Sequence, residues 1–442
     1  MLAYDTPSFL PGDFDDNVVS GGAMLREHEL RRHIVSEMHL RRWPKLTTPL
    51  QIIQILRLVD SKVRDAEFEA VLAPPAGGRI EAAGKRHVSG TLEGDIAFTW
   101  ERHSEASSIT LFAEPASHAA LASAIEWAES LPGDALRATR LTLVQDEDTA
   151  EAMMADMAFV PNELVSCHVA GQARIWSDFL IGADGYGRLL VAANGLAGSD
   201  LTRVVQRLQE LGNYRNLALL GLPVAQASWP LLDAAEQHLR RLAENIVRSD
   251  VRDDALMDQL SSLSLEIATI ASSANYRMSA TDAYAQLVDE RLNDLAPTAI
   301  AGFPSLLDFT QRRLLPGVRT CAAFTKRERQ VTARAAQFTA LLRTRIETRI
   351  ENQNGALLAS LERSAKMQLR MQQLVEGLSV VAISYYAISL IGHVLEGAET
   401  FLHGFNPHLA VAIVTPAVLV ATWLGLHHLK RGVLGHHPDL PG

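Results

Sequence analysis

The chain has 442 residues, of which 48% are hydrophobic and 21% charged, and this is enough for two or three domains with packed cores. Its formal net charge of −10 argues against nucleic acid as the main partner, because nucleic-acid-binding surfaces are usually basic. The two cysteines, Cys167 and Cys321, exclude a disulfide framework and a thiolate metal cluster and indicate a reducing compartment. We therefore expect no nucleic-acid partner, and no motif predicts a cofactor.

Residues 1–23 are predicted to be a disordered tail. The first twenty carry four aspartates and neither Lys nor Arg, so they show no secretory signal. An amphipathic helix should follow over 24–42 and end before Pro44. Its apolar residues recur at steps of four: Leu30, Ile34 and Met38. Glu37 and His39, near its end, are interpreted as surface or capping groups.

Residues 24–223 are predicted to form an α+β domain, because segments with strand character are interspersed with helical periodicity. The expected strands are 51–59, 95–103, 107–113, 141–145, 164–169, 173–180 and 188–192. The expected helices are 60–72, 117–131 and 199–211. The glycine-rich segment 182–187 is interpreted as a hairpin turn and not as a phosphate loop, because no helix follows it.

Residues 224–376 are predicted to be a helical, coiled-coil-like stalk. Residues 231–295 should be helical, and a further helix should run from Ser305 to the membrane with a kink at Pro316-Gly317. Breaks in the first segment are expected near 249–253 and 272–281. Apolar residues of the last helix keep a 3–4 spacing: Val331, Ala335, Phe338, Leu342, Ile346, Ile350, Leu357, Leu361, Ala365 and Leu369. A pattern of about 60 residues, roughly 90 Å of helix, favours self-association through this stalk.

Two apolar segments predict a transmembrane hairpin within 377–429. Residues 378–395 and 409–426 contain no Asp, Glu, Lys or Arg. As helices, each would be about 27 Å long, close to the roughly 30 Å hydrocarbon core of a bilayer. The alternative is a buried hairpin in a soluble helical protein, but two uncharged runs with matching charged flanks rarely occur by accident.

The charges around this hairpin predict its orientation. Basic residues precede the first segment and follow the second: Arg363, Lys366, Arg370, Lys430 and Arg431. The connecting turn, 396–408, carries two glutamates and neither Lys nor Arg. Because loops rich in Lys and Arg stay in the cytoplasm, the α+β domain and the tail 430–442 should be cytoplasmic and the turn external. The expected location is a bacterial inner membrane.

Four motifs, spread over nearly the whole chain after residue 24, carry a family resemblance. They are Leu30-Arg31-Arg32 with Glu37 and His39; Trp100-Glu101-Arg102-His103-Ser104-Glu105; Val205-Gln206-Arg207-Leu208 through Tyr214-Arg215; and residues 376–386, EGLSVVAISYY. Through them the chain resembles an uncharacterised bacterial family, the membrane-anchored proteins with domain of unknown function 3422. The resemblance implies membrane anchorage and no particular activity. The order of elements is also similar in layout to CorA-type magnesium channels, but their Gly-Met-Asn signature is absent.

A stripe of small and polar residues on the first apolar segment is the most informative candidate site. Its members fall at steps of three and four: Ser379, Ala382, Tyr386, Ser389, His393 and Glu396. Such a stripe suits helix packing in a membrane, where small and polar residues form the contacts. It also suits a hydrated ion path between symmetric copies, because polar groups within a membrane require water or partners. Both interpretations stay open.

Two weaker candidates involve histidines. Glu101, His103 and Glu105 alternate, so on an extended strand they would point to one side and could bind a divalent cation or supply acid–base groups. A salt-bridged or solvated strand face is the simpler interpretation. A second histidine cluster follows the second apolar segment and suits a polar tail better than a metal site: His427, His428, His436 and His437.

Three functional hypotheses follow from the sequence. The first is a non-enzymatic, membrane-anchored interaction or scaffold module that faces the cytoplasm and associates with itself through the stalk. The second is an oligomeric ion channel or transporter whose path is lined by the first apolar segment. The third, an enzyme that uses the face with Glu101, His103 and Glu105, has the least support, and we expect no enzymatic activity.

Overall fold

The structure is a computed structural model that describes residues 27–37, 43–247, 251–399 and 406–434. The predicted tail at 1–23, His39, His436 and His437 lie outside the described residues, as do residues 400–405 of the predicted external turn. The described part of the predicted first helix is α1 (Arg31–Glu37).

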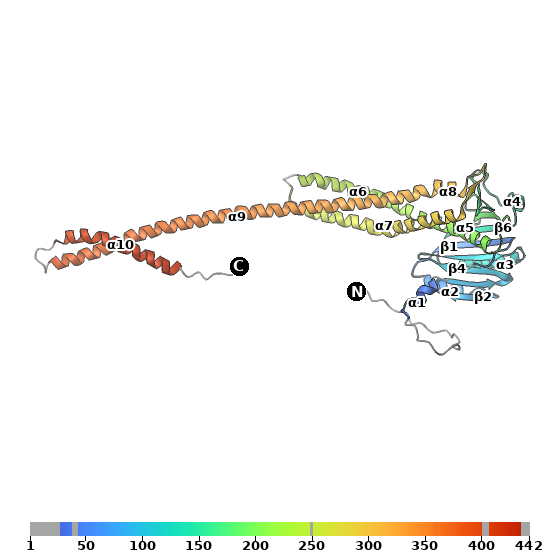
Figure 1. The fold of residues 1–442 in the computed structure, drawn as a ribbon, viewed down its shortest axis with the longest axis horizontal. Helices are drawn as coiled ribbons and strands as arrows, with labels where there is room; N and C mark the ends of the chain where they lie inside the picture. The colour runs from blue at the N-terminus through green and yellow to red at the C-terminus, as the bar shows by residue number, and fades with distance from the viewer. Residues whose placement is uncertain (1–26, 38–42, 248–250, 400–405, 435–442) are drawn as a thin grey trace, which may run out of the picture. The chain divides into compact units, whose positions relative to one another are not determined.

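A ten-stranded mixed sheet forms the N-terminal part of the fold (Figure 1). Its strands are β1 (Leu50–Leu58), β2 (Arg79–Gly84), β3 (His87–Leu92), β4 (Ile96–Arg102), β5 (Ala106–Ala113), β6 (Asp134–Val144), β7 (Val165–Val169), β8 (Ala173–Ser177), β9 (Gly187–Ala192) and β10 (Thr298–Ala299). Their order is β10-β7-β8-β9-β6-β1-β5-β4-β3-β2, and of the described pairs only β6 with β9 is parallel. The predicted N-terminal α+β domain is therefore confirmed, and its sheet is mixed.

Every predicted strand is present, although the sequence did not predict the hairpin β2–β3 or the two-residue strand β10. The reason is visible in β2, an edge strand whose side chains are almost all exposed. An exposed edge strand needs neither an apolar run nor regular alternation, which are the patterns that identify strands in a sequence. The strand expected at 173–180 ends earlier, at Ser177, because the chain turns at Asp178 and Phe179 toward the hairpin turn.

Helices cover both faces of the sheet and create two apolar cores. Against one face pack α2 (Arg64–Leu72) and α3 (His118–Ser130), through residues such as Val71 and Leu121. Against the other pack α5 (Gly198–Leu219) and the end of α7 (Asp253–Leu295), through residues such as Val205 and Leu292. The short helix α4 (Glu147–Met153) covers β8 and β9. Because both faces are buried, β1 is apolar along most of its length.

The remaining helices are α6 (Gly221–Val247), α8 (Leu306–Arg313), α9 (Leu315–Glu399) and α10 (Pro407–Leu434). The predicted break near 272–281 is wrong, because α7 continues through it and keeps a buried seam at Ile270, Ala274, Met278 and Thr281. The predicted kink at Pro316-Gly317 is displaced: the break lies at Leu314. Pro316 instead occupies the first turn of α9, where a missing N–H leaves no helical hydrogen bond unmade.

The chain divides into two compact units, unit 1 (residues 1–234 and 267–330) and unit 2 (residues 235–266 and 331–442). In unit 2 the last part of α6 and the first part of α7 run beside α9 (Figure 1). Buried residues of unit 2 include Leu239, Leu242, Leu256, Leu260, Leu263, Val331, Ala335 and Leu342. Asp253, at the start of α7, forms ion pairs of 3.1 Å with Arg345 and 2.6 Å with Arg349. Beyond Ile350 the apolar seam of α9 is exposed.

Three helical regions are long and apolar enough to cross a membrane by length and composition. The first, 198–246, has 33% of its most apolar window buried, and α5 packs twelve residues into the protein. The other two, within 306–397 and 407–428, have only 6% and 0% of their windows buried. The apolar ends of α9 and α10 are therefore the surfaces that the protein itself leaves uncovered.

Candidate functional site

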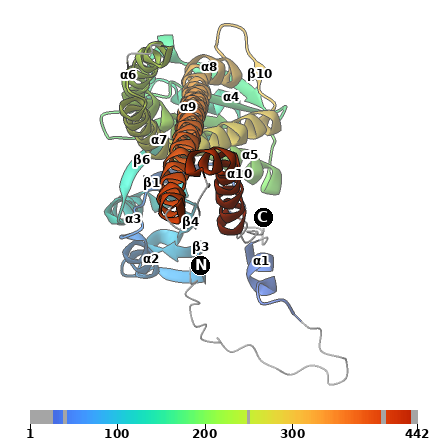
Figure 2. The ribbon, with the colours of Figure 1, turned by 90° about the vertical axis from the view of Figure 1, so that its left-hand side faces the viewer.

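The polar stripe lies on the side of α9 that α10 does not cover. Figure 2 shows α10 beside the end of α9, and Gly392 lies close to Val411 at this contact. The least exposed positions of the apolar part of α9 lie on the side facing α10: Val380, Ser384, Ala387, Ile388, Ile391 and Leu395. Ala382, Tyr386, Ser389, His393 and Glu396 are all exposed, and Ser379 is half-buried. Packing between the two helices therefore does not use the stripe.

Within the stripe, the His393 imidazole lies 3.5 Å from the Glu396 carboxylate, one helical turn away. Ser379 donates its hydroxyl hydrogen bond to the Val375 carbonyl oxygen, within the helix. On α10, His427 stacks on Trp423 with ring centroids 5.5 Å apart, and both His427 and His428 are exposed.

The predicted alternation of Glu101, His103 and Glu105 along a strand is wrong, because β4 ends at Arg102 and the next residues form the turn to β5. Glu101 lies 3.8 Å from His87 on β3, whereas Glu105 makes a two-point ion pair with Arg277 of α7, at 2.8 and 3.0 Å. Burial and the Glu105 carboxylate raise the pKa of Tyr284, which also contacts Glu105. Among the described residues, no three His, Cys, Asp or Glu side chains converge as metal ligands.

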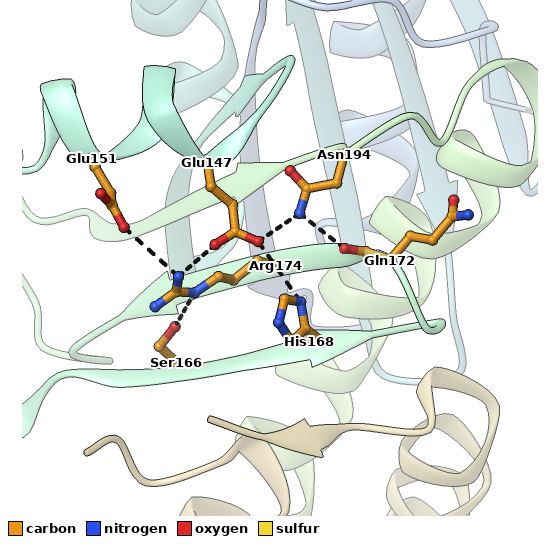
Figure 3. Close-up of polar contacts among 7 residues, drawn as sticks. All are labelled: Glu147, Glu151, Ser166, His168, Gln172, Arg174 and Asn194. Atoms are coloured by element: carbon orange, nitrogen blue, oxygen red, sulfur yellow. Dashed lines mark hydrogen bonds and ion pairs between the residues drawn. The ribbon is translucent and has the colours of Figure 1, made fainter. Parts of the chain in front are cut away.

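A polar network joins α4 to the strands β7 and β8 (Figure 3). Arg174 contacts Glu147 at 2.5 Å and donates to the Ser166 hydroxyl at 3.1 Å, and Asn194 donates to Glu147 at 2.8 Å. Burial raises the pKa of Glu147, but the hydrogen bonds from Arg174 and Asn194, together with the charges of Arg174 and His168, lower it overall. Because Arg174 of β8 pairs with both Glu147 and Glu151 of α4, the network is a structural connection between α4 and the sheet.

The arginine-lined cavity in unit 1 has a different character. It has a volume of about 300 Å³ and lies between β6, β8 and β9, the helices α5 and α8, and the loop 178–186. Of the described residues that line it, four are arginines and none is Asp or Glu: Arg137, Arg188, Arg215 and Arg313. Most of the other lining residues are apolar. The cavity therefore combines apolar walls with positive charge.

The two inner arginines have no acidic partner among the described residues. Arg137 donates only to amide oxygens: Gln54 at 3.1 Å, Asn213 at 2.9 Å and Gln209 at 2.8 Å. Burial and the nearby Arg215 lower the pKa of Arg137 to about 9, and burial lowers the pKa of Arg215 to about 10. Both guanidinium groups thus keep their charge at neutral pH, because these values remain above 7.

Arg215 lies against a stacked pair of aromatic rings. Its guanidinium carbon is 4.4 Å from the ring centroid of Phe179 and 5.1 Å from that of Phe309, and the two rings stack at 4.3 Å. Only 9% of Arg215 is exposed, and its Nη1 has no hydrogen-bond partner in the described structure. Phe179 has a φ of +53°, a conformation that costs about 1–3 kcal/mol for a residue other than glycine. One wall of the cavity thus contains both the unpaired charge of Arg215 and the backbone strain at Phe179.

The outer two arginines lie near acids outside the cavity. Arg188 lies 3.7 Å from Asp184, which also pairs with Arg140 at 3.0 Å, and Arg313 lies 3.8 Å from Glu163. Among the described residues that line the cavity, Arg137 and Arg215, on neighbouring walls, are thus the arginines without a nearby acid. Arg137 and Arg215 were not among the site residues expected from the sequence, although Arg215 falls on the apolar face of α5, four residues after Leu211.

These observations define a protein with an N-terminal mixed sheet, long helices and a C-terminal apolar helix, with a basic cavity beside the sheet. The chain belongs to the family described as "Protein of unknown function (DUF3422)", whose model matches residues 26–433. The family resemblance drawn from the sequence motifs is thereby confirmed. No curated protein matches the chain, and no solved structure matches it either.

Proposed function

We propose that the protein is a membrane-anchored interaction or scaffold module whose sheet domain faces the cytoplasm. One observation carries the proposal: the apolar windows of α9 and α10 are almost wholly uncovered by protein. Large apolar patches exposed to water are unfavourable, whereas a bilayer would cover both helices. Their backbone polar groups are satisfied within the helices, as a membrane requires.

The contact between α9 and α10 supports a hairpin in the membrane. Small residues such as Gly392 and Ala387 lie toward α10, and small residues allow helices to approach closely in lipid. Thr415 and Thr422 of α10 donate their hydroxyl hydrogen bonds to carbonyl oxygens one turn earlier in the same helix. The basic residues before 378 and after 426 favour cytoplasmic ends for this hairpin and an external turn.

Membrane attachment is tested by fractionation and by site-directed labelling. We expect the full chain to pellet with membranes after an alkaline wash and a variant ending at Glu376 to stay in the supernatant. Asn406→Cys should react with a membrane-impermeant maleimide in intact spheroplasts, and Gln373→Cys only after lysis, because the two positions flank opposite ends of the proposed hairpin. Burial raises the pKa of the Cys167 thiol to about 11 and also raises that of Cys321, so the native cysteines give a low background.

Two results would contradict this proposal. If the full-length protein remained soluble without detergent, the proposal of a membrane anchor would be refuted. If the labelling pattern were reversed, with Gln373→Cys accessible from outside, the anchor would be supported and the proposed orientation refuted.

Self-association through α9 is part of the proposal. Between Ile350 and Val375 the helix exposes large apolar side chains: Ile350, Leu357, Leu358, Leu361, Met367, Leu369, Met371, Leu374 and Val375. Helices that expose such residues over several turns are commonly paired with a second copy, which covers the apolar surface.

A second candidate function is an ion channel or transporter, and the position of the polar stripe favours it. Because the stripe lies away from α10, a symmetric neighbour could face it. We expect an oligomer in detergent and cation flux in liposomes that His393→Leu or Ser389→Leu abolishes. Leu390→Ala, at an exposed apolar position beside the stripe, is the matched control. A monomer, or unchanged flux in both stripe variants, would eliminate the channel and leave the scaffold proposal intact.

A further inference from the structure

We propose that the arginine-lined cavity binds a small organic oxyanion, a carboxylate or a phosphate monoester, attached to an apolar body. The inference is independent of the membrane proposal, because every lining residue belongs to unit 1. It assigns a ligand site to a region that the sequence motifs and the family description leave without a role.

The charge of the cavity identifies the ligand as an anion. Arg215 is buried and Arg137 is half-buried, neither has a carboxylate partner among the described residues, and an uncompensated buried charge normally destabilises a protein. Arg215 lines an open volume of about 300 Å³, and its enclosed Nη1 has no hydrogen-bond partner in the described structure. An oxyanion in that volume would offset the repulsion between the two guanidinium groups.

The residues around Arg137 hold its guanidinium group in place and leave its positive charge available to a ligand. Gln54, Gln209 and Asn213 orient the guanidinium through neutral amide oxygens, which accept hydrogen bonds without cancelling the positive charge. Gly212 of α5 makes room for it: a Cβ at this position would lie 2.5 Å from the Arg137 Cζ. An arginine held this way is pre-organised, so little side-chain entropy is lost when an anion binds.

The walls identify the rest of the ligand as apolar. Leu189, Leu208 and Leu211 line the cavity, and Leu180 and Ile181 stand exposed on the loop that borders it. Burying an apolar body against such walls is favourable by about 25 cal/mol per Å². A volume of about 300 Å³ is at the lower end of the range for small-molecule sites, which indicates a compact ligand.

The test measures binding of four probes to the full-length protein in lipid nanodiscs by calorimetry, with empty nanodiscs as blanks. The probes are octanoate, octyl phosphate, 1-octanol and inorganic phosphate. We expect octanoate or octyl phosphate to bind at least about tenfold more tightly than 1-octanol and inorganic phosphate, because 1-octanol lacks the anionic group and inorganic phosphate lacks the apolar chain. The stronger of the two octyl anions identifies the head group. If 1-octanol bound as tightly as the octyl anions, the proposal that the ligand is an anion would be refuted. If inorganic phosphate bound as tightly as they do, the proposal that the ligand has an apolar body would be refuted.

Variants separate a ligand-binding role of the arginines from a structural one. Arg215→Met should weaken binding of the preferred probe at least about tenfold while the unfolding temperature stays the same or rises, because the variant removes an unpaired buried charge. Gly212→Ala should also weaken binding, because it displaces the Arg137 guanidinium. Arg203→Met, at an exposed arginine of α5 that pairs with Asp200 outside the cavity, is the control and should change binding less than about threefold. Unchanged binding in both Arg215→Met and Gly212→Ala would refute the site.

Discussion

Replacing Glu67 with alanine is expected to lower the free energy of unfolding by about 3–5 kcal/mol. Glu67, on α2, is buried beneath the sheet, where its carboxylate accepts hydrogen bonds from the Trp100 indole N–H at 2.9 Å and from the Ser107 hydroxyl. Arg102 lies 3.8 Å from the same carboxylate and stacks on the Trp100 ring. Removing the acid leaves a fully buried indole N–H without an acceptor and a neighbouring cation without its counter-charge.

The measurement is denaturant unfolding of the detergent-solubilised full chain, followed by tryptophan fluorescence. Glu69→Ala on the same helix is the matched control, because Glu69 is exposed, and we expect it to change stability by less than about 0.5 kcal/mol. If Glu67→Ala proved no more destabilising than Glu69→Ala, the hydrogen-bonded carboxylate would not be what secures α2 to the sheet.

Replacing Gly221 with alanine should destabilise unit 1 by about 2–3 kcal/mol, at the upper end of the usual cost of overpacking. Gly221 begins α6 at a point where three helices meet. A Cβ there would overlap the Thr281 hydroxyl of α7 and would lie 3.2 Å from the Thr281 Cβ and 3.3 Å from the Cys321 Sγ of α9. Thr281 is itself buried and donates its hydroxyl hydrogen bond to the Ala218 carbonyl oxygen, so it has no free space into which it can move.

Gly355→Ala provides the contrast for this prediction. Gly355 lies within α9 and has open space around its Cα, so the added methyl group meets no atom and the helix gains the higher propensity of alanine. We expect this variant to unfold at the same or a slightly higher temperature, by the same measurement. Equal effects of the two substitutions would mean that the helix crossing at Gly221 is not tightly packed.

Much of the architecture could be predicted from the sequence because it depends on local patterns. The apolar strand at β1, the hairpin of β4 and β5, and the turn before β9 follow from alternation and turn residues. The four motifs between residues 30 and 386 identified the family. Features without such a pattern were missed or misplaced. The exposed edge strand β2 has no apolar run, and the small and polar residues of 272–281 suggested a break in α7 where Ala274 and Met278 maintain a buried seam.

The candidate sites divide in the same way. The 3–4 spacing of its residues placed the polar stripe on one face of α9. Only the position of α10 decided that this face is the uncovered one. Glu101 and Glu105 are four residues apart, yet one lies beside His87 and the other pairs with Arg277, because the chain turns between them.

The sequence by itself determined most of the helices, most of the strands and the two apolar segments, since each depends on residues close together in the chain. Only the tertiary structure decided that Arg137 of β6 and Arg215 of α5 would line one cavity without an acid between them. Residues nearly eighty positions apart carry no mutual periodicity, and their meeting depends on how the sheet, α5 and α8 pack. The basic cavity is therefore a property of packing, whereas the apolar helices are a property of composition.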